Sequence, residues 1–117
     1  MKIIFTASFH KLLSGFPMIT EEDIIELVKK YPNSNNLVVI DNIDVSKIIK
    51  WYLFSKKIRI LILLQTVKWK FIPVSIVKKE TFRWKNITKE NYQQLFGNDI
   101  DKAIWDMDHG KYTETQF

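Results

Sequence analysis

The sequence predicts one α+β domain over residues 1–117, in which an N-terminal strand and helix pack on a small antiparallel sheet and C-terminal helices follow. The first observation is the length of 117 residues, which suits a single hydrophobic core. The second is a composition of 46% hydrophobic and 14% aromatic residues with only three Gly and three Pro, which is typical of a packed globular chain. The third is a series of short β-branched segments at roughly ten-residue spacing in the middle of the chain.

The N-terminal part is expected to contain a strand and a helix. Residues 2–13 begin with β-branched and aromatic side chains, so we expect a strand that leads into a short helical or irregular segment. A helix is then expected over residues 21–30, because Thr20 can cap its first turn and three acids oppose the positive end of the helix dipole. Pro32 ends this helix.

The middle of the chain is expected to form an antiparallel meander. Its strands are expected at residues 37–40, 48–54, 58–64 and 71–77. Pro73 has no backbone N–H to donate, so the strand that contains it should lie at an edge of the sheet or carry a bulge.

Two further helices are expected after the last of these strands, over residues 88–96 and 99–108, with Gly97 between them. Gly110 is expected to stop the second helix. The domain would therefore carry a C-terminal helical extension over residues 98–117.

Neither a membrane segment nor cysteine chemistry is expected. The longest apolar run, residues 60–64, has five residues, whereas roughly 18 are needed to cross a bilayer. Residues 1–5 are too short for the apolar core of a signal peptide. The chain has no Cys, which excludes disulfides and thiolate metal sites. We therefore expect a cytoplasmic protein with no membrane partner.

Positive charge gathers in the middle of the chain. Between Lys47 and Lys89 twelve basic residues face one acid, Glu80, which gives this stretch a charge of +11 within a chain of net charge +5. Such a concentration favours a polyanionic partner such as RNA. The alternative is a surface that is basic only for solubility.

Established catalytic motifs are missing from the sequence. His10 and His109 are the only histidines, and Asp106 and Asp108 beside His109 match no closed zinc or calcium pattern. No phosphate-binding glycine loop and no nucleophile elbow is present. No cofactor or metal is therefore expected.

Two short segments interleave cations with aromatic rings, namely residues 68–71 and 82–85. Cations neutralise phosphates, and rings stack on unpaired bases for about 1–3 kcal/mol each. The alternative for both tryptophans is packing in the core. The residues predicted to bind RNA are Lys56, Lys68, Trp69, Lys70, Arg83, Trp84 and Lys85.

Cationic side chains can support RNA cleavage without histidine. The 2′-OH must become nucleophilic, the phosphorane must be stabilised and the leaving 5′-oxygen must be protonated, all of which lysine and arginine can assist. Arg59 is the sole charge in an apolar segment, so we expect it to face a solvent-exposed concave surface. Lys78 and Lys79 are neighbours on a predicted strand, so only one of them can share that face.

Residues 57–62, the following hairpin, residues 71–79 and the segment Asn86-Ile87-Thr88 together resemble the RelE/ParE toxin superfamily, in particular its HigB-like branch. Members have an arginine in a central strand, a following strand that ends in lysines and an Asn-Leu-Thr-like entry to a helix. The resemblance covers residues 47–92. It implies a helical N-terminal half packed on an antiparallel sheet, metal-independent cleavage of mRNA on the ribosome and a cognate antitoxin.

The resemblance also implies a catalytic set. The family's catalytic cations correspond to Arg59 and to Lys78 or Lys79, and Lys57 lies beside them. This sequence departs from the family in having one clear N-terminal helix in place of a helical hairpin, and a longer tail after residue 98.

Three functions remain open at this point. The first is the toxin component of a type II toxin–antitoxin module that acts as an endoribonuclease (mRNA interferase, a hydrolase). The second is a catalytically inert nucleic-acid-binding module. The third is a protein-interaction module that uses an edge strand and exposed aromatic side chains to bind an antitoxin or gyrase.

Overall fold

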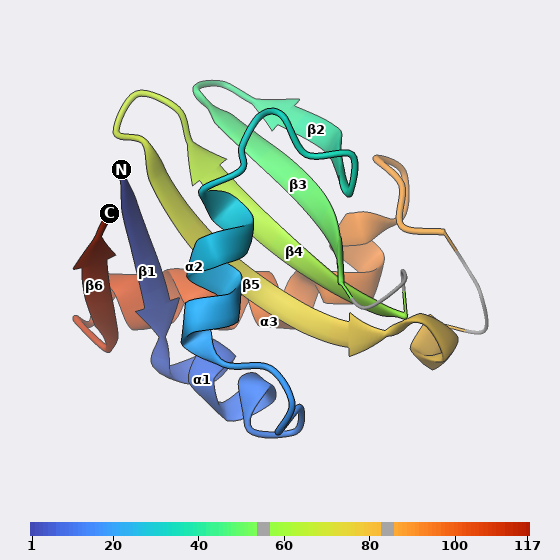
Figure 1. The fold of residues 1–117 in the computed structure, drawn as a ribbon, viewed down its shortest axis with the longest axis horizontal. Helices are drawn as coiled ribbons and strands as arrows, with labels where there is room; N and C mark the ends of the chain where they lie inside the picture. Colours follow the sequence, from blue (N-terminus) through green and yellow to red (C-terminus); the bar gives the residue numbers. More distant parts are fainter. Residues whose placement is uncertain (54–56, 83–85) are drawn as a thin grey trace.

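The computed structural model describes residues 1–53, 57–82 and 86–117, and over these residues it is an α+β fold with one six-stranded mixed sheet (Figure 1). The strands are β1 (Lys2–Thr6), β2 (Leu37–Ile43), β3 (Ser46–Leu53), β4 (Ile58–Gln65), β5 (Lys70–Lys78) and β6 (Tyr112–Gln116). The helices are α1 (Ala7–Leu13), α2 (Glu21–Val28) and α3 (Tyr92–Asp108), and a 3-10 turn, η1 (Lys79–Phe82), follows β5. The order of the strands is β2-β3-β4-β5-β1-β6.

The predicted antiparallel meander is confirmed for β2 to β5, each of which pairs antiparallel with the next. The sheet is nevertheless larger than predicted and mixed. β1 lies between β5 and β6, parallel to the first, where Ile3 faces Phe71, and antiparallel to the second, where Ile3 faces Thr115. The N-terminal strand is therefore part of the sheet and does not pack on it.

Pro73 lies inside the sheet, so the expectation of an edge strand is wrong and the expectation of a bulge is correct. β5 has β4 on one side and β1 on the other. Leu61 pairs with Ser75 and Ile62 pairs with Pro73, which leaves Val74 as the extra residue of a bulge. The bulge accommodates the missing N–H of the proline without ending the strand.

The C-terminal segment differs from the prediction in two ways. A single helix, α3, runs through Gly97 where two helices were expected. Glycine costs roughly 1 kcal/mol in a helix, and the burial of Phe96 and Ala103 against the sheet outweighs that cost. The helix stops at Gly110, whose φ of 68° is the left-handed value expected there. The helical extension expected over residues 98–117 is wrong beyond this point, because β6 follows and pairs with β1.

The α2 face of the sheet carries the larger core. In Figure 1, α2 crosses the front of the sheet and α3 runs behind it. The α2 face buries a continuous hydrophobic cluster whose sheet members include Ile49, Trp51, Ile60 and Ile62. The predicted cap of α2 is confirmed, since the Thr20 hydroxyl accepts a bond from the Asp23 N–H (3.2 Å) while the Asp23 carboxylate accepts one from the Thr20 N–H (2.9 Å).

The α3 face holds a smaller cluster in which Ile48, Leu61 and Val74 meet Phe96 and Ala103. Polar side chains are buried among these residues, and they position the candidate site described below. No helix in the described part of the chain is long and apolar enough to cross a membrane.

Candidate nucleic-acid interface

Three predicted site residues gather where β3 ends, β4 begins and β5 ends. Leu53 and Lys78 both pair with Ile58, so these strand termini form one end of the sheet. Lys57 and Lys78 are exposed here and Lys79 is half-buried. The Lys79 N–H donates to the Lys57 carbonyl (2.8 Å), which holds the two lysines next to each other. We call this group of Lys57, Lys78 and Lys79 the basic end.

Arg59 is not exposed, so the expectation that it faces a solvent-exposed concave surface is wrong. It is 5% exposed and lies on the α3 face, opposite Tyr52 and Val77. Its guanidinium carbon lies 5.6 Å from the centre of the Tyr52 ring. β4 is an interior strand with both faces covered, and on such a strand a lone charge does not indicate which side meets water.

Lys50 is a second buried cation on this face, and the predicted site did not include it. Its side chain is 3% exposed. The ammonium donates to the Asn86 side-chain carbonyl (2.8 Å) and to the Ile87 backbone carbonyl (3.0 Å). It also lies 5.4 Å from the Tyr52 ring, so this ring contacts both Lys50 and Arg59. The signal that could have found Lys50 is the one that identified Arg59, a single charge within an apolar strand.

The adjacent lysines of β5 do not behave as two strand neighbours. Lys78 pairs with Ile58 and shares the α2 face with it, whereas Arg59 lies on the α3 face. Lys79 already belongs to η1, so strand alternation does not determine its direction. The structure therefore brings Lys57 and Lys79 together and separates Lys78 from Arg59.

The predicted RNA-binding residues that can be placed lie elsewhere. Lys68 and Trp69 are in the turn between β4 and β5, and Lys70 is the first residue of β5, so all three lie at the opposite end of these strands from the basic end. Lys70 has the Glu114 carboxylate 3.9 Å from its ammonium. Trp69 is half-exposed and lies in an edge-to-face arrangement with the partly buried ring of Tyr31, so it is not part of the core. Lys56, Arg83, Trp84 and Lys85 lie outside the described residues.

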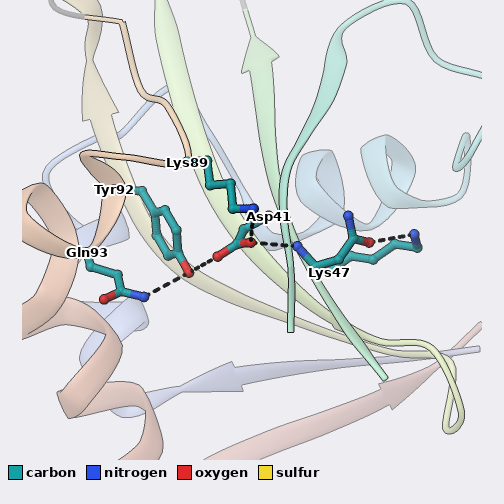
Figure 2. A network of polar contacts seen from close by, with 6 residues as sticks. Asp41, Lys47, Lys89, Tyr92 and Gln93 are labelled. Carbon is teal, nitrogen blue, oxygen red and sulfur yellow. Dashed lines mark hydrogen bonds and ion pairs between the residues drawn. The ribbon is translucent and has the colours of Figure 1, made fainter. Parts of the chain in front are cut away.

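A polar network around Asp41 holds Lys89 and Tyr92, which follow the segment that covers Lys50 (Figure 2). The Tyr92 hydroxyl donates to Asp41 (2.6 Å), and the Lys89 ammonium lies 4.0 Å from the other oxygen of that carboxylate. Burial raises the pKa of Tyr92, and its hydrogen bond to the Asp41 carboxylate raises it further. The network thereby ties the edge strand β2 to the start of α3.

The turn before α3 is also closed by its own hydrogen bonds. The Asn91 side chain accepts from the Thr88 N–H (2.8 Å) and donates to the Asn86 carbonyl (2.7 Å). These bonds hold Asn86 in place over Lys50. Sequence reasoning assigned this segment only to a helix entry and did not foresee that its carbonyl oxygens solvate a buried cation.

Among residues 1–53, 57–82 and 86–117, no three His, Asp or Glu side chains are grouped so that they could hold a metal ion. No protein-family model, curated protein or solved structure matches this chain.

Proposed function

We propose that the basic end binds RNA, and that the protein is a toxin-like, metal-independent ribonuclease that resembles the RelE/ParE superfamily. The observation that carries the proposal is the pairing of Lys57 with Lys79 at the surface, on a strand framework that also buries two cations, Lys50 and Arg59. Buried charges are screened far less than exposed ones. They strengthen the positive potential that a phosphate backbone meets at this end.

In the proposed chemistry the exposed and the buried cations have different roles. Lys57 and Lys79 can reach substrate. One of them, in its neutral form, would take the proton of the 2′-OH as that oxygen bonds to phosphorus, and the other would neutralise the phosphate and give a proton to the leaving 5′-oxygen. Arg59 and Lys50 are buried and would act through the electrostatic field. The same proposal includes a cognate antitoxin that covers the basic end, and action on translated mRNA requires a cytoplasmic location.

The burial of Arg59 favours a second candidate, a module that binds RNA without cleaving it. A group that stabilises the phosphorane must lie within hydrogen-bond distance of it, and a side chain that is 5% exposed meets that requirement only if the site opens. The third function, binding of a protein partner, would use a different surface.

Binding is tested by the salt dependence of affinity for single-stranded RNA. If the three lysines of the basic end meet phosphates, log K should fall against log salt with a slope of about −2.1. The variant that carries Lys57→Ala and Lys79→Ala should lower this slope by about 1.4. The matched variant with Lys68→Ala and Lys70→Ala, at the other end of the strands, should leave it unchanged. A wild-type slope near zero, or equal changes in both variants, contradicts binding at the basic end.

Cleavage is tested by primer extension on cellular mRNA after induction of the protein. New 5′ ends that appear with the wild type and disappear with Lys57→Ala and Lys79→Ala support the ribonuclease. Arg59→Lys retains a buried positive charge, so it distinguishes direct contact of Arg59 with the RNA from an effect of its electrostatic field. If Arg59 acts only through the field, this variant should reduce cleavage by less than tenfold. RNA binding with no new 5′ ends would contradict the ribonuclease and support the module that binds RNA without cleaving it.

A further inference from the structure

A second surface of the molecule is apolar and lies away from the basic end. A pocket of about 360 Å³ opens between α3 and the β2–β4 part of the sheet. Its apolar lining comes from Ile43, Ile48, Leu63, Ile100 and Ile104. Ser46, which also lines it, pairs with Gln65 at the strand ends opposite the basic end. The volume lies within the range of about 300–1,000 Å³ that is typical of binding pockets.

The rim of this pocket is exposed. Ile43 is 45% exposed and Ile104 is 51% exposed, and both line the pocket. Val45, two residues beyond Ile43 in the turn after β2, is 55% exposed. An apolar pocket that continues into an apolar rim is typical of a surface that another molecule covers.

We propose that this pocket and its rim dock an apolar segment of a polypeptide partner, and that the segment carries a basic residue beside its apolar anchors. A small molecule would fill the pocket and leave Ile43, Val45 and Ile104 exposed, whereas a polypeptide covers both. The bulge of β2 between Val39 and Asp41 interrupts its free edge, so docking relies on side chains in the pocket and not on a long added strand.

The charge of the rim decides between a foreign partner and a second copy of this chain. Asp44, in the turn between Ile43 and Val45, is exposed. Asp101 on α3 lines the pocket. A symmetric contact between two copies would place these acids against themselves, which is unfavourable. A basic residue in the partner would complement them.

Gly97 supplies the variant that tests the pocket. It lines the pocket, and a Cβ built on it would meet no atom within 4 Å. Gly97→Leu should therefore project a side chain into the pocket, while its better helix propensity keeps α3 folded. Gly97→Ala is the matched control, because it makes the same change in propensity and fills little of the pocket. Thermal unfolding of both variants checks that neither loses stability.

The experiment is a selection of random 12-residue peptides displayed on phage against the wild-type protein, followed by measurement of the affinities of the selected peptides. We expect enrichment of two or more large apolar residues next to Lys or Arg. Binding should fall at least tenfold in Gly97→Leu and less than threefold in Gly97→Ala. Asp101→Asn should reduce the preference for a peptide over its Lys→Glu counterpart.

Other outcomes overturn the proposal. Failure to enrich any sequence, enrichment of acidic peptides, or equal binding to wild type and Gly97→Leu would each do so. Binding of octylamine without binding of any peptide would assign the pocket to a small ligand. Sedimentation that shows a wild-type dimer and a Gly97→Leu monomer would assign it to a second copy. RNA binding at the basic end is measured separately, so the two proposals can fail independently.

Discussion

The two faces of the sheet are built by different rules. The α2 face buries a large hydrophobic cluster that includes Ile49, Trp51, Ile60 and Ile62. On the α3 face the sheet buries Lys50, Arg59 and Ser75 among its apolar residues. Packing on the α2 face is therefore determined by the volume of apolar side chains. Packing on the α3 face also depends on the direction of individual hydrogen bonds.

The polar contacts of the second face position α3 in particular. The Ser75 hydroxyl donates to Asp99 (2.6 Å), which joins β5 to the helix. The buried carboxylate of Asp106 accepts from the Ser8 N–H (2.7 Å), which joins the helix to the first turn of α1. These bonds place α3 at a defined rotation and depth, which a smooth apolar contact would leave freer.

The largest expected loss of stability comes from a substitution on the α2 face. Ile60 is fully buried there, so Ile60→Ala should lower the free energy of unfolding by about 2–5 kcal/mol through lost burial and a cavity. Urea denaturation measures this, and the loss should be the same at pH 7 and at pH 9 because no titrating group is involved. A loss below about 1 kcal/mol would show that the face repacks.

The next effect tests the α3 face. Lys50→Met retains the length of the side chain but leaves the Asn86 and Ile87 oxygens without their donor, so it should cost about 1–3 kcal/mol. The control is Lys47→Met, whose exposed bond to Asn42 should matter by less than about 0.5 kcal/mol. Greater stability in Lys50→Met would mean that desolvation of the ammonium outweighs its hydrogen bonds.

The pH dependence of stability gives a further test of the difference between the two faces, since we expect it on the α3 face alone. Because the pKa of Tyr92 is raised on folding, its contribution to stability is complete below the unfolded value of about 10 and is lost as pH rises through the folded value. Tyr92→Phe should cost about 1–2 kcal/mol at pH 7. It should also make the alkaline decline of stability shallower. Tyr112→Phe, at an exposed position of β6, should change neither quantity.

The smallest expected effect concerns the cap of α2. Thr20→Ala removes the hydroxyl that accepts from the Asp23 N–H, at an exposed site, so it should cost about 0.5–1 kcal/mol. Glu22→Ala, on the same turn but outside the capping box, is the control. Equal losses in both variants would indicate that the helix dipole, and not the cap, stabilises this turn.

The difference between the faces also explains what the sequence could predict. Helix α2 and the strands of the meander depend on local caps and apolar runs, and they were found within a few residues. β6 was missed because its side chains are polar and exposed, and its pairing with β1 joins residues over a hundred positions apart. The sequence predicts two helices in place of α3 because the low helix propensity of Gly97 takes no account of packing against the sheet.

The candidate site was predicted only in part for the same reason. Lys57 and Lys79 do lie together, but through a backbone bond beyond the end of β5 that no alternation rule describes. Arg59 and Lys50 are both lone charges in apolar strands, and their burial depends on what packs over them. A sequence pattern identifies such charges without showing whether they meet substrate or the interior.

The position of β1 has a consequence for the order in which the chain can fold. β1 leaves the ribosome before the other strands of this sheet, yet its partners, β5 and β6, are made only after residue 69 and residue 111. The hairpins of β2 to β5 need only short loops to close, whereas β1 must wait, with Ile3 and Phe5 uncovered, for contacts of high sequence separation. Pulse-labelled hydrogen exchange during refolding should therefore show the amides of β3 and β4 protected before those of β1.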